Sequence, residues 1–168
     1  MANQRMALGK ATEHRVTTML LEEGRTVLLP AVDDDGVDIV VLPKTSGVMA
    51  EAATKEGKVE NDVLFNFIMA SQSNGQYGTL QAIQVKSIST GGLFAAISCP
   101  NPRPNYWFVF YIKDIDTIWL INSMDFVKIA SRNVTGKNKG KYSLDLATKV
   151  NRTRKHTEYI ATDFSRIP

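Results

Sequence analysis

Three polar side chains interrupt two apolar stretches that have the composition of core β-strands. The stretch "GVDIVV" at residues 36–41 carries Asp38, and "LQAIQVKSIS" at residues 80–89 carries Gln84 and Lys86. A carboxylate, an amide and an ammonium are costly to bury among aliphatic side chains unless they pair with one another or coordinate an ion. The pattern therefore indicates a polar site within an apolar framework.

The spacing of these residues favours a single site. Side chains alternate between the two faces of a strand, so Gln84 and Lys86 share one face and Val85 points to the other. Residues two apart on one face lie about 7 Å apart, and a neighbouring strand lies about 5 Å away. If Asp38 belongs to that neighbouring strand, the three polar groups converge on one small volume.

A fourth polar group, Glu13, lies in a helix predicted over residues 8–23. Val16 and Leu20 follow Glu13 by three and seven residues, so the carboxylate points along or beside the buried stripe of this helix.

Metal-assisted hydrolysis of a phosphodiester is the chemistry that uses this set of side chains. Mg²⁺ (or Mn²⁺) prefers oxygen ligands and keeps several waters, so one or two carboxylates and a substrate phosphate complete its shell. Asp38 is the expected main metal ligand, Glu13 a second, and Gln84 a weaker ligand through its amide oxygen. Lys86 is expected to hold a water or the scissile phosphate and to stabilise developing negative charge.

The elements that must position these residues follow from the apolar patterns. The helix at 8–23 ends at Gly24, and strands at 26–32 and 37–42 flank the turn "DDDG". Their order predicts an α/β or α+β layer structure with a mixed sheet. The remaining expected elements are a strand at 80–88, strands at 93–98, 106–112, 117–121 and 141–146, helices at 61–71 and 123–131, and a helical end.

Length and composition favour one folded, cytoplasmic domain spanning residues 1–168. No run of about 18 apolar residues is present, so no membrane partner is expected. The polar segment 1–15 lacks the apolar core of a signal peptide. A single cysteine, Cys99, excludes an internal disulfide and a cysteine-based zinc site.

Positive charge is concentrated near the end of the chain. Residues 132–156 contain eight basic residues and one acid, Asp145. This asymmetry suits a polyanion such as DNA, although a solvated basic surface is the alternative interpretation. The expected DNA-backbone contacts are Lys137, Lys139, Lys141, Arg152, Arg154 and Lys155.

The order of elements and the motifs together resemble the PD-(D/E)xK nuclease superfamily, which has the restriction-endonuclease-like fold. The resemblance covers residues 8–121 and implies an αβββαβ core. It matches Glu13 in "GKATEHR", Asp38 in "DGVDIVV", and Gln84 with Lys86 in "AIQVKS". It implies a Mg²⁺-dependent DNA endonuclease of restriction, repair or junction-resolving type. Two active sites are needed to cut both strands, so a homodimer is expected.

This chain departs from the family pattern at two points. Gln84 stands where the third motif has an acid, and residues 43–79 form a probable insertion. Each site residue also has a structural interpretation: Asp38 bonding loop amides, Gln84 as a structural amide, Lys86 as an edge-strand lysine and Glu13 as a solvated helix residue. The second function hypothesis is accordingly a catalytically inactive nucleic-acid-binding or assembly module on the same fold.

Overall fold

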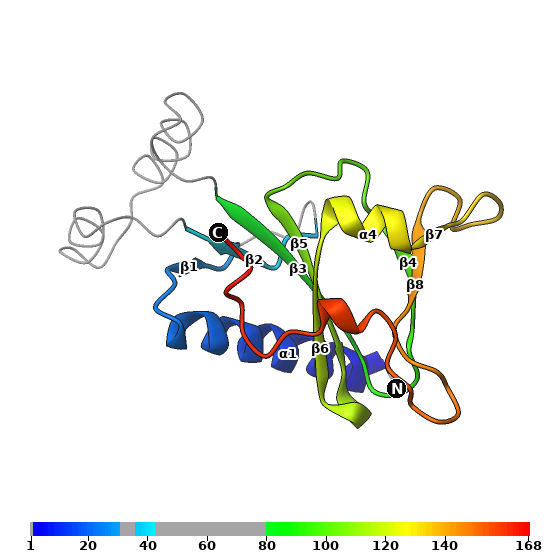
Figure 1. Cartoon of the computed structure of the whole chain (residues 1–168), viewed down its shortest axis with the longest axis horizontal. Helices are drawn as coiled ribbons and strands as arrows, with labels where there is room; N and C mark the ends of the chain where they lie inside the picture. Colours follow the sequence, from blue (N-terminus) through cyan, green and yellow to red (C-terminus); the bar gives the residue numbers. More distant parts are fainter. Residues whose placement is uncertain (1, 31–35, 43–79) are drawn as a thin grey trace.

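A five-stranded mixed sheet forms the centre of the protein (Figure 1). The computed structural model describes residues 2–30, 36–42 and 80–168. The strand order is β1-β2-β3-β5-β6, in which β3 and β5 run parallel and the other neighbours run antiparallel. The predicted α/β architecture with a mixed sheet is therefore confirmed. The strands are β1 (Val27–Leu28), β2 (Ile39–Val41), β3 (Gln81–Ile88), β5 (Tyr106–Ile112) and β6 (Thr117–Asn122).

A second sheet of three strands lies over one face of the first. Its order is β4-β8-β7, with β4 (Leu93–Ile97), β8 (Tyr142–Asp145) and β7 (Ser131–Arg132). The ring of Phe94 on β4 packs edge-on against that of Phe110 on β5, with 4.9 Å between centroids. The helix α4 (Ser123–Ile129) packs on the same side, because the ring centroids of Phe126 on α4 and Phe108 on β5 lie 4.5 Å apart.

Side-chain alternation divides the main sheet into two apolar faces. Phe108 and Phe110 belong to the core shared with α4 and the second sheet. Ile83 and Val85 belong to the core that Val16 and other residues of the helix α1 (Ala2–Glu22) cover from the opposite side. Alternate residues of β3 therefore contact either the core with α4 and the second sheet or the core with α1.

The first helix forms because its apolar positions recur at four-residue intervals. Thr12, Val16 and Leu20 are all buried, and they lie on one stripe that packs on the sheet. The helix begins six residues before the predicted start. It ends at Glu22, one residue before the predicted end, because Gly24 adopts a left-handed φ of 72° and its N–H donates to the Leu21 carbonyl.

The chain after β8 differs from the helical end that the sequence predicts. Apart from a short 3-10 turn at Thr157–Tyr159, this segment is irregular or extended, and His156 adopts a left-handed φ of 51°. Ile160 bridges to Trp119 of β6, and the fully buried Phe164 and Ile167 cover the same core as α1. The apolar residues of the tail cover the sheet instead of forming one face of a helix.

The αβββαβ core implied by the family places a helix between its third strand and the next. In this structure the connection from β3 to β5, residues 89–105, contains β4 and no helix, and α4 follows β6. The helix predicted at 61–71, the insertion at 43–79 and residues 33–35 of the "DDDG" turn lie outside the described residues. Within the ranges that are described, no helix is long and apolar enough to cross a membrane.

Candidate functional site

Strand register places Asp38 beside Gln84. Ile39 of β2 faces Ile83 of β3, and the Asp38 N–H donates to the Ile83 carbonyl at 2.9 Å. The residue before Ile39 therefore lies level with the residue after Ile83. By alternation, Asp38, Gln84 and Lys86 lie on the face of the sheet that carries the Phe108 core.

The Asp38 carboxylate closes the ladder between β2 and β3. Its Oδ2 accepts the Val85 amide N–H at 2.6 Å, just where the pairing of β2 with β3 stops. An acceptor is needed there because a buried amide without a partner costs about 1 to 3 kcal/mol. A bond from the Asp38 carboxylate to a backbone amide is the kind of contact that the structural interpretation of Asp38 expects. The same bond holds the carboxylate beside Gln84.

Gln84 provides an unusual buried oxygen. The residue is only 6% exposed, and its Oε1 has no hydrogen-bond partner among the described residues. Buried polar atoms are almost always hydrogen-bonded, so an orphaned acceptor beside a carboxylate indicates a position for a bound cation or water.

Gly36 packs directly on the Gln84 amide. A Cβ atom built on Gly36 would lie 2.0 Å from Nε2 of Gln84, which is closer than any real contact, and the φ of Gly36 is +68°. Only glycine satisfies both conditions. Gly36 is the last residue of the predicted "DDDG" turn, and its position two residues before Asp38 is the signal in the sequence that points to this packing role.

Lys86 extends the polar set along β3. It lies opposite Phe110 of β5 and is partly exposed. Within the described part of the chain its ammonium forms no ion pair with Asp or Glu. The charge can therefore act on a ligand at this face.

Glu13 lies on the helix that packs against the other face of the sheet. Its Oε2 forms an ion pair with Lys10 at 2.6 Å, and its side chain is 20% exposed. The residues of β3 that meet the helix layer are Ile83 and Val85, whereas Gln84 and Lys86 point away from it. The structure therefore brings Asp38, Gln84 and Lys86 to one face and leaves Glu13 on the helix of the opposite layer.

The donor set fits a divalent cation with hard-oxygen preference. Asp38 supplies a carboxylate, and Gln84 supplies the orphaned amide oxygen. Among the residues that the structure describes, no group of three His, Cys, Asp or Glu could hold a metal. An ion here would take its remaining ligands from water and a substrate phosphate, as Mg²⁺ commonly does.

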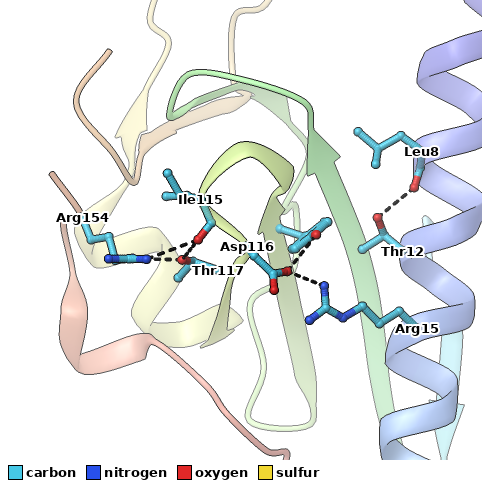
Figure 2. Close-up of polar contacts among 8 residues, drawn as sticks. Leu8, Thr12, Arg15, Ile115, Asp116, Thr117 and Arg154 are labelled. Atoms are coloured by element: carbon cyan, nitrogen blue, oxygen red, sulfur yellow. Dashed lines mark hydrogen bonds and ion pairs between the residues drawn. The ribbon is translucent and has the colours of Figure 1, made fainter. Parts of the chain in front are cut away.

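The basic residues expected to contact DNA fall into two groups. Lys137, Lys139 and Lys141 lie exposed in the loop between β7 and β8. The other three bind groups of the protein itself. Arg152 pairs with Asp114 at 2.8 Å, and Lys155 pairs with Asp145. Arg154 donates to the Thr117 hydroxyl at 2.9 Å and to the Ile115 carbonyl at 3.2 Å (Figure 2).

A polar network next to Arg154 ties α1 to the β5–β6 turn. Arg15 Nη1 lies 2.6 Å from Oδ1 of Asp116, which also accepts the Tyr111 hydroxyl at 2.9 Å (Figure 2). The bonds from Arg15 and then Tyr111 lower the pKa of the Asp116 carboxyl. Burial, followed by the bond to Asp116, raises the pKa of Tyr111. Because all three groups are paired, this network positions the first helix.

Comparison with solved structures yields a structural likeness, whereas comparison with sequences does not. No family model matches the chain, and no curated protein matches it. A solved structure similar to it is the bacterial homing endonuclease I-Ssp6803I, with a TM-score of 0.45 and 16% sequence identity. The likeness covers 90% of this chain and 85% of that one.

Proposed function

We propose that this protein is a divalent-metal-dependent DNA endonuclease of the PD-(D/E)xK type, in a variant with Gln84 at the acidic position. The single observation that carries the proposal is the buried, unpartnered Oε1 of Gln84 beside the anchored Asp38 carboxylate. A purely structural amide would be expected to satisfy its oxygen.

In this proposal Asp38 and Gln84 would hold Mg²⁺ (or Mn²⁺), whose chemistry when bound would be Lewis-acid activation of water and neutralisation of phosphate charge. Lys86 lies on the same face and stabilises the negative charge that develops on the phosphate oxygens. A lysine suits this role because its ammonium acts as a compact point charge. Because Glu13 lies on the helix of the opposite layer, in this proposal it could act only in the second shell of the ion, through water and around the edge of β3.

The experiment is cleavage of supercoiled plasmid with and without Mg²⁺. Lys86→Ala should abolish nicking while DNA binding measured in EDTA survives. Lys113→Ala is the matched control, because Lys113 is an exposed lysine that follows the last residue of β5 and is not among the residues proposed for the site. Unchanged nicking by Lys86→Ala would remove this lysine from the mechanism.

Cutting both strands requires two such sites, so we also propose that the active form is a homodimer. A monomer in solution that makes double-strand breaks in a single binding event would contradict this part of the proposal. Sedimentation analysis with and without duplex DNA gives the oligomeric state directly.

The second candidate function is a nucleic-acid-binding or assembly module that has lost its chemistry. Gln84 favours it, since an amide brings no charge to the site, and so does the pairing of Glu13 with Lys10. Calorimetric titration with Mn²⁺ separates the two candidates. A site with measurable affinity that disappears in Asp38→Asn supports the nuclease, and no binding in the wild type supports the inactive module.

A further inference from the structure

The loop between β7 and β8 carries a positive charge that the protein does not compensate. Arg132, Lys137, Lys139 and Lys141 are exposed, and no acidic residue occurs from Ser131 to Leu144. In the described part of the chain none of the four basic side chains forms an ion pair. The loop projects outward from the end of the second sheet (Figure 1).

Backbone hydrogen bonds hold this loop in a hairpin. The Asn133 N–H donates to the Lys141 carbonyl at 2.8 Å, and the Gly140 N–H donates to the Asn133 carbonyl at 2.8 Å. Gly136 and Gly140 make the tight turn possible with φ values of 72° and 83°. The lysines are therefore carried on a formed scaffold, which lowers the ordering entropy that binding would cost.

Three of the other four basic residues of the segment 132–156 contrast with this hairpin. Arg152 and Lys155 each pair with an aspartate of the protein, and Arg154 donates to a hydroxyl and a carbonyl. The fourth, Lys149, is exposed but stands apart from the hairpin. Within the described part of segment 132–156, the hairpin is therefore where exposed, unpaired basic side chains are grouped.

We infer that the β7–β8 hairpin enters the major groove of double-stranded DNA, with Lys137, Lys139 and Lys141 on the flanking phosphates. The inference rests on the proposed function in taking DNA as the partner. A two-stranded ribbon fits a major groove about 12 Å wide. Val134, 74% exposed in the same loop, provides an apolar group for a thymine methyl.

The hairpin and the candidate site lie on one side of the main sheet. Lys86 shares its face with Phe110, which contacts Phe94 of β4. In the second sheet β8 separates β4 from β7, so the hairpin strand lies about 10 Å from β4. The hairpin and the face that carries Lys86 are thus on one side of the main sheet, as contact of one duplex with both requires.

The test measures binding by fluorescence anisotropy in EDTA, so that cleavage plays no part. A short mixed-sequence DNA duplex and an RNA duplex of the same sequence are titrated over a range of KCl concentrations. The hairpin variant replaces all three lysines (Lys137→Gln, Lys139→Gln and Lys141→Gln). The control removes the same charge elsewhere, through Lys113→Gln, Lys128→Gln and Lys149→Gln, which are also exposed.

The hairpin variant should bind the DNA duplex about tenfold more weakly or worse, and its slope of log affinity against log salt should fall by about 2 to 3. The control should keep most of that slope. The RNA duplex should bind more weakly to the wild type and respond little to the hairpin variant, because the A-form major groove is too narrow to enter.

Equal losses in the two triple variants, or equal losses on DNA and RNA, would overturn the inference in favour of general charge attraction. The outcome is independent of catalysis. If the hairpin variant binds DNA more weakly but the wild type does not cleave plasmid, the hairpin inference stands and the nuclease proposal is rejected. If the wild type cleaves plasmid but the hairpin variant binds DNA normally, only the hairpin inference is rejected. Thermal unfolding of each variant confirms that these exposed substitutions leave the fold intact.

Discussion

Replacing Gly36 by alanine tests the packing on which the candidate site depends. The new Cβ would lie 2.0 Å from Nε2 of Gln84, and the residue would have to keep a φ of +68°. An L side chain in the left-handed region costs about 1 to 2 kcal/mol. Forcing a side chain into an occupied site adds about 1 to 3 kcal/mol.

The Gln84 amide has little room to move away from a new Cβ atom, because the residue is only 6% exposed. We therefore expect Gly36→Ala to lower the free energy of unfolding by about 2 to 5 kcal/mol. For a chain of this size that corresponds to a fall in Tm of roughly 4 to 20 °C.

Gly91→Ala is the matched control. Gly91 has a similar φ of +83°, but nothing lies within 4 Å of its Cβ position. It should therefore show only the backbone cost, about 1 to 2 kcal/mol. The difference between the two alanine variants measures the contact with Gln84.

The assay is urea unfolding of both variants, followed by a double-mutant cycle with Gln84→Ala. Shortening Gln84 should make Gly36→Ala less costly, with a coupling of about 1 kcal/mol or more. Metal binding should weaken in Gly36→Ala and not in Gly91→Ala. Equal losses of stability in the two glycine variants, with no coupling to Gln84, would refute the reasoning.

Two further predictions concern the contacts that hold the fold around the site. Asp116→Asn should lower stability by less than about 1 kcal/mol at neutral pH, because its pair with Arg15 is exposed. The pKa of Asp116 is lowered in the folded state. The stabilisation that its carboxylate provides is therefore fully present above the usual pKa range of a carboxyl group, and it is lost as the pH falls through the lowered pKa. Thermal unfolding at pH 7 and at about pH 2 checks this. The buried Arg25 donates to the Ile167 and Pro168 carbonyls, so Arg25→Met should cost about 2 to 4 kcal/mol in urea unfolding. The control Arg166→Met removes one exposed hydrogen bond and should cost under about 1 kcal/mol; equal costs would contradict the role of Arg25.

The sequence predicts the central strands well because their patterns are long and strongly apolar. The runs that became β3, β5 and β6 each contain β-branched or aromatic residues, and β3 differs from its predicted range only at the first residue. Alternation along β3 also places Gln84 and Lys86 on one face before any coordinates are known.

The tail could not be predicted in the same way. Ile160, Phe164 and Ile167 recur at intervals of four and three residues, which is the period of a helix. In the structure this segment bridges to β6 and covers the α1 core, and the Ala161 amide bonds the Ile118 carbonyl at 3.0 Å. Tertiary packing overrides the local period. The pairing of β4 with β8 is equally invisible to local patterns, since the two strands are far apart in the chain.

The position of Glu13 likewise depends on tertiary packing. Helical periodicity places the carboxylate beside a buried stripe, but it does not say which face of the sheet that stripe covers. In the structure α1 packs on the Ile83 and Val85 face, so a carboxylate from this helix can approach Lys86 only around the edge of β3.

Among the described residues, the β2 side of β3 loses its strand partner beyond Ile83, and the contact of Asp38 explains why. The pairing of β2 with β3 stops at Ile83 and the Asp38 carboxylate takes the Val85 amide, whereas β3 continues to Ile88. Within the described ranges no strand pairs with this part of β3 on the β2 side. The ion pair of Glu13 with the 74% exposed Lys10 is worth at most about 1 kcal/mol, so it presents little barrier to recruitment by a cation. The early end of β2 therefore has two structural consequences within the described ranges: the Asp38 carboxylate is anchored on the Val85 amide, and β3 has no strand partner on the β2 side beyond this point.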